Sequence, residues 1–125
     1  RFLTSEAALA PVIGRLAERG LLFLDNHSTD DSVAPRLARR NGLPFVLSDR
    51  TVDERLASSL AIDARLAQIE RIALTSNAAV AMAQSYPVTI DRLATWARDL
   101  NARGIVLAPI TAMVGRQQIS LSEAE

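Results

Sequence analysis

The chain has 125 residues, of which 49% are hydrophobic and 22% charged, a composition typical of one globular domain with a sizeable core. Fourteen basic and fourteen acidic residues give a formal net charge of +0, so no overall charge favours nucleic acid or an anionic membrane surface as a partner. The chain has no cysteine and no lysine, which excludes thiolate nucleophiles, disulfides and lysine bases.

The first half of the chain alternates between helical and extended patterns. Residues 5–19 carry apolar side chains at helical spacing and predict a helix, in which only Pro11 is unfavourable. The continuous apolar run at 21–25 predicts a strand that is buried on both faces. A second helix is predicted at 32–41 and a second short strand at 44–48. The residues that could cap this second helix are Thr29, Asp30 and Asp31.

The second half repeats the alternation. A long amphipathic pattern predicts a helix at 52–74, followed by a third strand at 78–84. A further helix is predicted at 89–103 and a fourth strand at 105–110. The last residues, 115–125, have no strong period and are expected to form a flexible tail.

Four alternations of helix and strand with short joints predict an α/β domain whose parallel sheet is covered by helices. Periodicity leaves open whether that sheet is open or belongs to a barrel. No apolar run approaches the roughly 20 residues that are needed to cross a bilayer, so no membrane span is predicted in this chain.

Polar and ionisable residues follow all four predicted strands, where parallel α/β folds carry their chemistry. We therefore expect four residues to lie together at one end of the sheet: Asp25, Asp49, Gln84 and Thr111. Helix caps also fall at this end and also select aspartate, serine, threonine and asparagine, which weakens the inference.

Several of these residues have a functional and a structural interpretation. Asp25 could act as a metal ligand or a general base, or it could simply bind the amides of the turn that follows its strand. His27 is the only histidine, so any imidazole chemistry would depend on it, although a single loop histidine is more often solvated. Capping of the long helix explains Asp53 at least as well as a functional role does.

Two further features are better explained by packing and solvation. Trp96 lies at helical spacing with apolar neighbours, which favours a packing role over a platform for sugar stacking. Three arginines of the second predicted helix are typical of a solvated face, although they could also meet a polyanion: Arg36, Arg39 and Arg40.

From Arg1 to about Val114 the chain resembles the divergent polysaccharide deacetylase family. The Arg-Phe-Thr stretch of the family is matched by Arg1, Phe2 and Thr4, and its later aspartate-containing turn by Asp49 and Asp53. The strand that ends in Leu-Asp-Ser before a threonine pair is matched by Leu24, Asp25, Ser28 and Thr29. The closing pattern of the family is matched by Arg103, Gly104, Ile105, Pro109 and Ala112.

The resemblance implies a distorted (β/α) barrel of the NodB type, in which a zinc-like divalent metal activates water against an N-acetyl or O-acetyl group. It further implies an acetylated polysaccharide or peptidoglycan-type glycan as substrate, and a location in the cell envelope, periplasmic or membrane-anchored. On this resemblance Asp25 and Arg1 are the expected catalytic residues. The expected substrate-binding residues are Asp49, Gln84 and Thr111.

Two departures from the family pattern limit this expectation. The Asp-Asp pair and the Asn-His-Met-Gly stretch of the family precede the segment that resembles this chain. Residues 1–114 therefore look like the C-terminal half of the domain. The N-terminal half would then be a missing partner, and we do not expect this chain alone to hold a metal. Where many relatives have Gly-His-Pro, this sequence has Ala83, Gln84 and Ser85, and a glutamine can orient a substrate but cannot shuttle a proton.

Three functional hypotheses remain from the sequence. The first is an incomplete deacetylase-like hydrolase domain, so that enzymatic activity is uncertain. The second is a non-catalytic glycan-binding or scaffolding domain that retains the fold, and the third is an α/β domain that acts through a partner surface.

Overall fold

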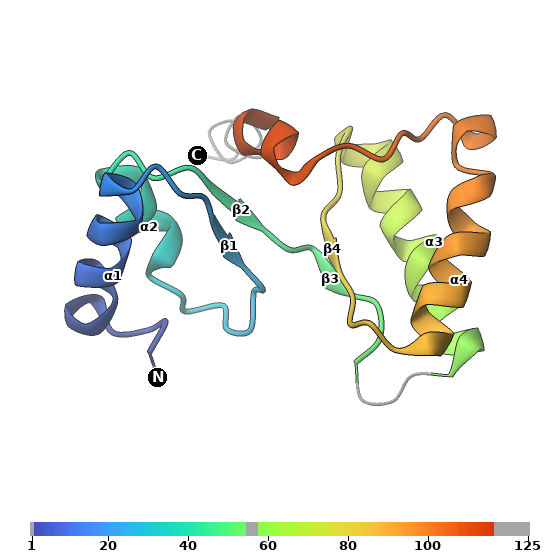
Figure 1. The fold of residues 1–125 in the computed structure, drawn as a ribbon, viewed down its shortest axis with the longest axis horizontal. Coiled ribbons are helices and arrows are strands. Elements are labelled where there is room, and N and C mark those ends of the chain that lie inside the picture. The colour runs from blue at the N-terminus through green and yellow to red at the C-terminus, as the bar shows by residue number, and fades with distance from the viewer. Residues whose placement is uncertain (1, 55–57, 117–125) are drawn as a thin grey trace. The chain divides into compact units, whose positions relative to one another are not determined.

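The computed structural model describes residues 2–54 and 58–116. The chain divides into two compact units, Arg1–Leu47 and Ser48–Glu125, and each unit is described by itself. The first unit contains α1 (Glu6–Glu18), β1 (Phe23–Asp25), α2 (Ala34–Arg40) and β2 (Phe45–Leu47) (Figure 1). The second contains β3 (Arg50–Thr51), α3 (Ser59–Ser76), β4 (Ala81–Met82) and α4 (Pro87–Arg98), followed by the 3₁₀ turns η1 (Asn101–Arg103) and η2 (Ile110–Met113).

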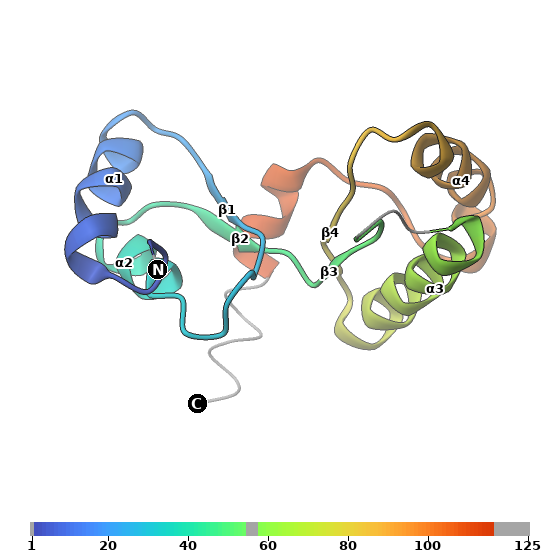
Figure 2. The ribbon, with the colours of Figure 1, turned by 90° about the horizontal axis from the view of Figure 1, so that it is seen from below.

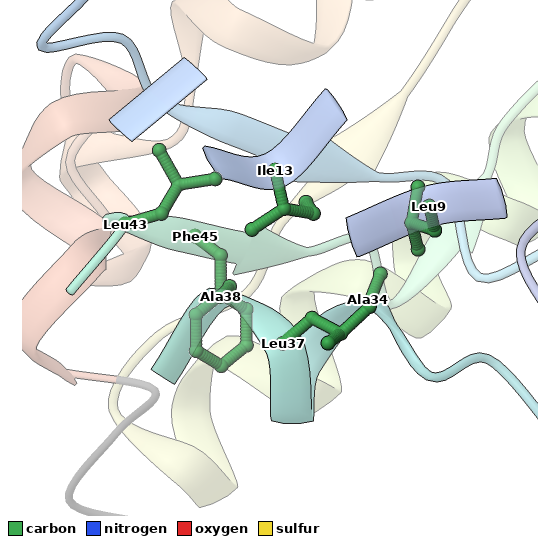
Figure 3. Close-up of a cluster of buried hydrophobic side chains, with 7 residues drawn as sticks. All are labelled: Leu9, Ile13, Ala34, Leu37, Ala38, Leu43 and Phe45. Carbon is green, nitrogen blue, oxygen red and sulfur yellow. The ribbon is translucent and has the colours of Figure 1, made fainter. Parts of the chain in front are cut away.

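The first unit is a parallel pair, β1 and β2, packed against α1 and α2. Phe23 pairs with Phe45 and Asp25 with Leu47, and α2 forms the crossover between the two strands. Figure 3 shows how apolar side chains from α1, α2 and the β2 segment gather into one buried cluster. Its members are Leu9, Ile13, Ala34, Leu37, Ala38, Leu43 and Phe45. Burial of each large member stabilises the unit by about 1.5–3 kcal/mol, so this cluster holds the helices on the strands.

The arginines of α2 join the elements of the first unit to one another. Arg36 and Arg40 both bind the carboxylate of Glu6 on α1, at 2.7 and 2.9 Å. The guanidinium of Arg39 lies over the ring of Phe45, 5.8 Å from its centroid. Because all three side chains have partners within the unit, intramolecular pairing accounts for them without a polyanion.

The second unit is also built on a parallel pair, in which Arg50 is the partner of Ala81 and Thr51 of Met82. Figure 2 shows α3 and α4 side by side. Asp63 of α3 and Arg92 of α4 form a two-pronged ion pair, with N–O distances of 2.7 and 2.8 Å.

The core of the second unit lies between its strands and helices. Val52, Ile62 and Leu66 form a buried cluster, and Trp96 packs against it. The indole N–H of Trp96 donates to Oε1 of Glu70 at 2.6 Å. The packing role predicted for Trp96 is therefore confirmed.

The α/β interpretation is confirmed in outline, because short parallel strands lie between helices. The expectation of a fourth strand at 105–110 is wrong: residues 105–109 form no strand pairing with the described residues, and Ile110 begins η2. An apolar run favours extended structure, but a strand also needs a neighbouring strand to take up its backbone hydrogen bonds. Pro109, which has no N–H, further weakens pairing.

Three smaller predictions also need correction. The long helix begins at Ser59 instead of 52 and is capped by Ser58, whose side chain accepts from the Ala61 N–H. The helix α2 has Val33 at its cap position and no side-chain cap, so none of the three proposed caps is used. Leu24 of β1 is 38% exposed, so that strand is not buried on both faces.

Most of the tail expected at 115–125 lies outside the described residues. Within the described ranges, none of the helices combines the length and the apolar character that a membrane span requires.

Candidate functional site

A buried carboxylate, that of Asp53, lies at the carboxyl end of the β3–β4 pair. Asp53 directly follows Val52, whose N–H donates to the carbonyl of Met82 at 2.8 Å and so extends the pairing of β3 with β4. Oδ2 of Asp53 accepts two hydrogen bonds, from the backbone N–H of Gln84 and from the hydroxyl of Thr89, both at 2.8 Å. Asp53 is only 1% exposed, and none of the described residues donates to its Oδ1.

This carboxylate fixes both ends of the turn that joins β4 to α4. Gln84 begins the turn and Thr89, in the first turn of α4, is completely buried. Pro87 occupies the first helical position, where its fixed φ suits helix initiation. A negative charge beside a helix N-terminus is also electrostatically favourable. Gln84 and Tyr86 are exposed between these anchors, so their side chains are presented by a backbone of fixed shape.

Asp49 lies at the other end of the same strand pair. Its N–H donates to the carbonyl of Val80, and its Oδ2 accepts from the N–H of Val80, both at 2.7 Å. Val80 precedes β4 whereas Gln84 follows it, so the prediction that Asp49 and Gln84 share one end of the sheet is wrong. The sequence pattern predicts that the strand at 44–48 ends before Asp49. In the structure a further strand, β3, begins directly after Asp49, so this residue precedes β3.

Asp25 binds the loop that follows its own strand. It is 2% exposed, with Oδ1 accepting from the N–H of His27 and Oδ2 from the hydroxyl of Ser32, both at 2.9 Å. The hydroxyl oxygen of Ser32 in turn accepts from the N–H of Ala34 at the start of α2, at 3.3 Å. These hydrogen bonds agree with the interpretation of Asp25 as a residue that binds the turn after its strand. A catalytic role of Asp25 stays a prediction.

The remaining predicted residues are placed as follows. His27 has a positive φ of 54° and its Nε2 lies 3.3 Å from Oδ1 of Asp30, in an exposed part of the loop. Thr111 is exposed within η2 and does not follow a strand. Arg1 lies outside the described residues. Asp25 belongs to the first unit and Gln84 to the second, so their common placement at one sheet end stays a prediction.

The described side chains do not fit a hydrolytic divalent-metal centre. Such a zinc site typically takes three protein ligands and keeps one position open for water. No group of three or more histidine, cysteine, aspartate or glutamate side chains that could hold an ion occurs within the described ranges. Both oxygens of Asp25 also accept hydrogen bonds from their own loop.

The second unit also has an apolar groove of about 700 Å³, lined by α3, β4 and residues 104–113. Val106 and Leu107 are 77% and 64% exposed beside it. Glu70 lies in its wall, where Oε1 accepts from Trp96 and lies 3.0 Å from a guanidinium nitrogen of Arg103. The groove wall is thus mostly apolar, its carboxylate Glu70 is paired with Trp96 and Arg103, and the lining reaches Ala83, the residue before Gln84.

Asp53 is the residue whose importance sequence analysis underestimated. In the sequence, capping of the long helix explains Asp53 at least as well as a functional role does, but that helix is capped by Ser58. The available signal was its position directly after the buried Val52, which is the pattern expected at a strand end.

The fold is an α/β domain, because short parallel strands alternate with helices. A buried carboxylate and exposed polar groups lie where a strand pair ends, which is the position where such domains carry their sites. The chain belongs to the divergent polysaccharide deacetylase family, which matches residues 1–114.

The chain is similar to the solved structure of the uncharacterized protein ATU2773 from Agrobacterium tumefaciens C58, with 32% sequence identity and a TM-score of 0.87. The match covers 91% of this chain and 46% of that chain, so this chain spans about half the length of its structural relative. A comparison with curated proteins finds no match.

Proposed function

We propose that the chain forms the glycan-contacting part of a polysaccharide deacetylase-type hydrolase domain that acts on N- or O-acetylated glycan. The observation that carries this proposal is the anchored turn after β4, where Asp53 binds Gln84 and Thr89 and leaves the Gln84 side chain exposed. Family membership supplies the substrate class, since the family is named for polysaccharide deacetylases.

The side chain of Gln84 has the chemistry that an acetamido group requires. Its amide offers a carbonyl acceptor and two N–H donors, and an acetamido group presents one donor and one acceptor in return. Because the Asp53 anchor already orders the backbone, binding loses less conformational entropy than on a free loop. A glutamine does not exchange protons at neutral pH, so in this proposal Gln84 orients the substrate and takes no part in proton transfer.

The hydrolytic groups, including the ligands of any zinc-like metal, would then come from a partner region equivalent to the part of the longer relative that this chain does not cover. We propose that this region packs on the apolar groove, because Val106 and Leu107 leave about two-thirds or more of their surface uncovered there. The cell envelope, periplasmic or membrane-anchored, is the proposed location, since peptidoglycan-type glycan is found there; cell fractionation would test it.

A second candidate, a non-catalytic glycan-binding domain, is favoured by a different observation. Glutamine, which cannot shuttle a proton, stands at position 84, where the resemblance to the family implies a histidine. Both candidates predict binding of an acetylated glycan, and they differ in whether acetate is released once the partner region is supplied.

Binding is tested by isothermal titration calorimetry of the 125-residue chain with N-acetylchitotetraose and with its fully deacetylated counterpart. We expect preference for the acetylated ligand, reduced in Gln84→Ala and largely kept in Gln84→Asn, which retains the amide. Equal affinity of the wild type for both ligands, or no binding to either, would contradict the proposal. Acetate release after co-expression with the N-terminal region of a family member would separate the hydrolase from the non-catalytic candidate.

A further inference from the structure

The aromatic residues of the second unit have different roles. The chain contains one tryptophan, one tyrosine and three phenylalanines, and the three phenylalanines are all in the first unit. Trp96 packs on the core of the second unit, and its indole N–H binds Glu70. Tyr86 instead leaves 39% of its surface exposed at the start of α4. Packing within the unit therefore accounts for Trp96 but leaves much of the Tyr86 ring in water.

The backbone that carries Tyr86 is held on both sides. Asp53 binds the N–H of Gln84, two residues before Tyr86, and the hydroxyl of Thr89, three residues after it. The carbonyl of Tyr86 accepts the first hydrogen bond of α4, from the N–H of Ile90 at 3.0 Å. An exposed ring on an ordered turn is a preorganised surface, because the turn need not be ordered again when a ligand binds.

We propose that Tyr86 is the stacking platform for a pyranose ring of an acetylated hexosamine, next to Gln84; this inference rests on the function proposed above. A sugar ring has a face of C–H groups and a rim of polar groups. An aromatic side chain buries the face, while a nearby amide binds the polar substituents. Tyr86 and Gln84, two residues apart on one anchored turn, supply these two kinds of contact.

The single tyrosine allows a direct test. In the 125-residue chain with ring-labelled tyrosine, all tyrosine NMR signals come from Tyr86. Titration with N-acetylchitotetraose is expected to shift these signals with the same saturation as the calorimetric titration. Tyr86→Ala is expected to weaken binding about tenfold, and Tyr86→Phe, which keeps the ring face, by less than about threefold. Leu60→Ala, which truncates another exposed apolar side chain, at 79% exposure and outside the groove lining, is the matched control.

The outcomes separate this inference from the proposed function. Calorimetric binding with unmoved tyrosine signals, or with unchanged affinity in Tyr86→Ala, overturns the platform and leaves the proposed function standing. Absence of any binding by the wild-type chain overturns the proposed function and the platform with it. Equal losses in Tyr86→Ala and Leu60→Ala would show a general effect of apolar truncation and also overturn the platform.

Discussion

The hydroxyl of Thr89 donates a hydrogen bond of 2.8 Å to Oδ2 of Asp53, across 36 residues of sequence, and both side chains are almost completely buried. Thr89→Val removes this donor without changing the volume and leaves a buried carboxylate with fewer partners. We expect a loss of about 1–3 kcal/mol in the free energy of unfolding, measured by urea denaturation. Thr89→Ser, which keeps the hydroxyl, should retain more stability than Thr89→Val, and the reverse order would contradict the assignment.

The helix α1 depends on the side chains that it buries in the first unit. Leu9 is completely buried in the cluster shown in Figure 3, and Leu9→Ala is expected to lower the free energy of unfolding by about 2–5 kcal/mol. Val12, on the same helix, is 40% exposed, so Val12→Ala should cost about 0.5 kcal/mol or less. Similar losses for both variants in chemical denaturation would show that α1 does not pack through this face.

The ion pair between α3 and α4 has a defined pH dependence. The hydrogen bond from Arg92 to Asp63, together with their charge attraction, raises the pKa of the Arg92 guanidinium above its ordinary value. A group whose pKa is higher in the folded state contributes fully below its unfolded-state pKa and loses that contribution only as the pH rises through the folded-state pKa. The stability difference between wild type and Arg92→Gln should therefore stay constant from about pH 7 to about pH 10.

Arg98→Gln serves as the control for the ion pair, because Arg98 is an exposed arginine on the same helix. Thermal unfolding of the three proteins over this pH range would check the prediction. A difference between wild type and Arg92→Gln that shrinks below pH 10 would show that another titrating group controls the pair.

Sequence patterns predicted that the four helices exist, although not all of their bounds, for a physical reason. The spacing of Leu9 and Ile13 defines the buried face of α1 without reference to other segments, and the N-cap Ser5 can be recognised from local sequence. Patterns were less informative for strands, because a strand depends on a partner elsewhere in the chain. The segment 105–110 is as apolar as a strand but remains unpaired among the described residues.

The candidate site was only partly predictable. The polar residues after the strands were found, including Gln84, but the register of the β3–β4 pair was not. That register separates Asp49 from Gln84 and brings Asp53 to Gln84 in its place. Register follows from contacts across the sheet, and the local pattern around Asp49 and Asp53 contains no information about it.

We expect the 125-residue chain to bind zinc more weakly than about micromolar and to release no measurable acetate from an acetylated oligosaccharide. A zinc ion that used both oxygens of Asp25 would have to displace the N–H of His27 and the hydroxyl of Ser32. Both donors are only partly buried, so each lost hydrogen bond costs about 0.5–1.5 kcal/mol, which lowers the affinity by about 2- to 12-fold.

Calorimetric titration with zinc chloride and an acetate-release assay would test this expectation. Asp25→Asn should lower the free energy of unfolding, because the amide nitrogen cannot accept the hydrogen bond that one carboxylate oxygen accepts. The zinc affinity of this variant should equal that of the wild type within error. His27→Ala, which removes the only imidazole, should likewise leave zinc affinity unchanged. Sub-micromolar zinc binding that disappears in Asp25→Asn would show that the loop opens to a metal and that Asp25 is a ligand after all.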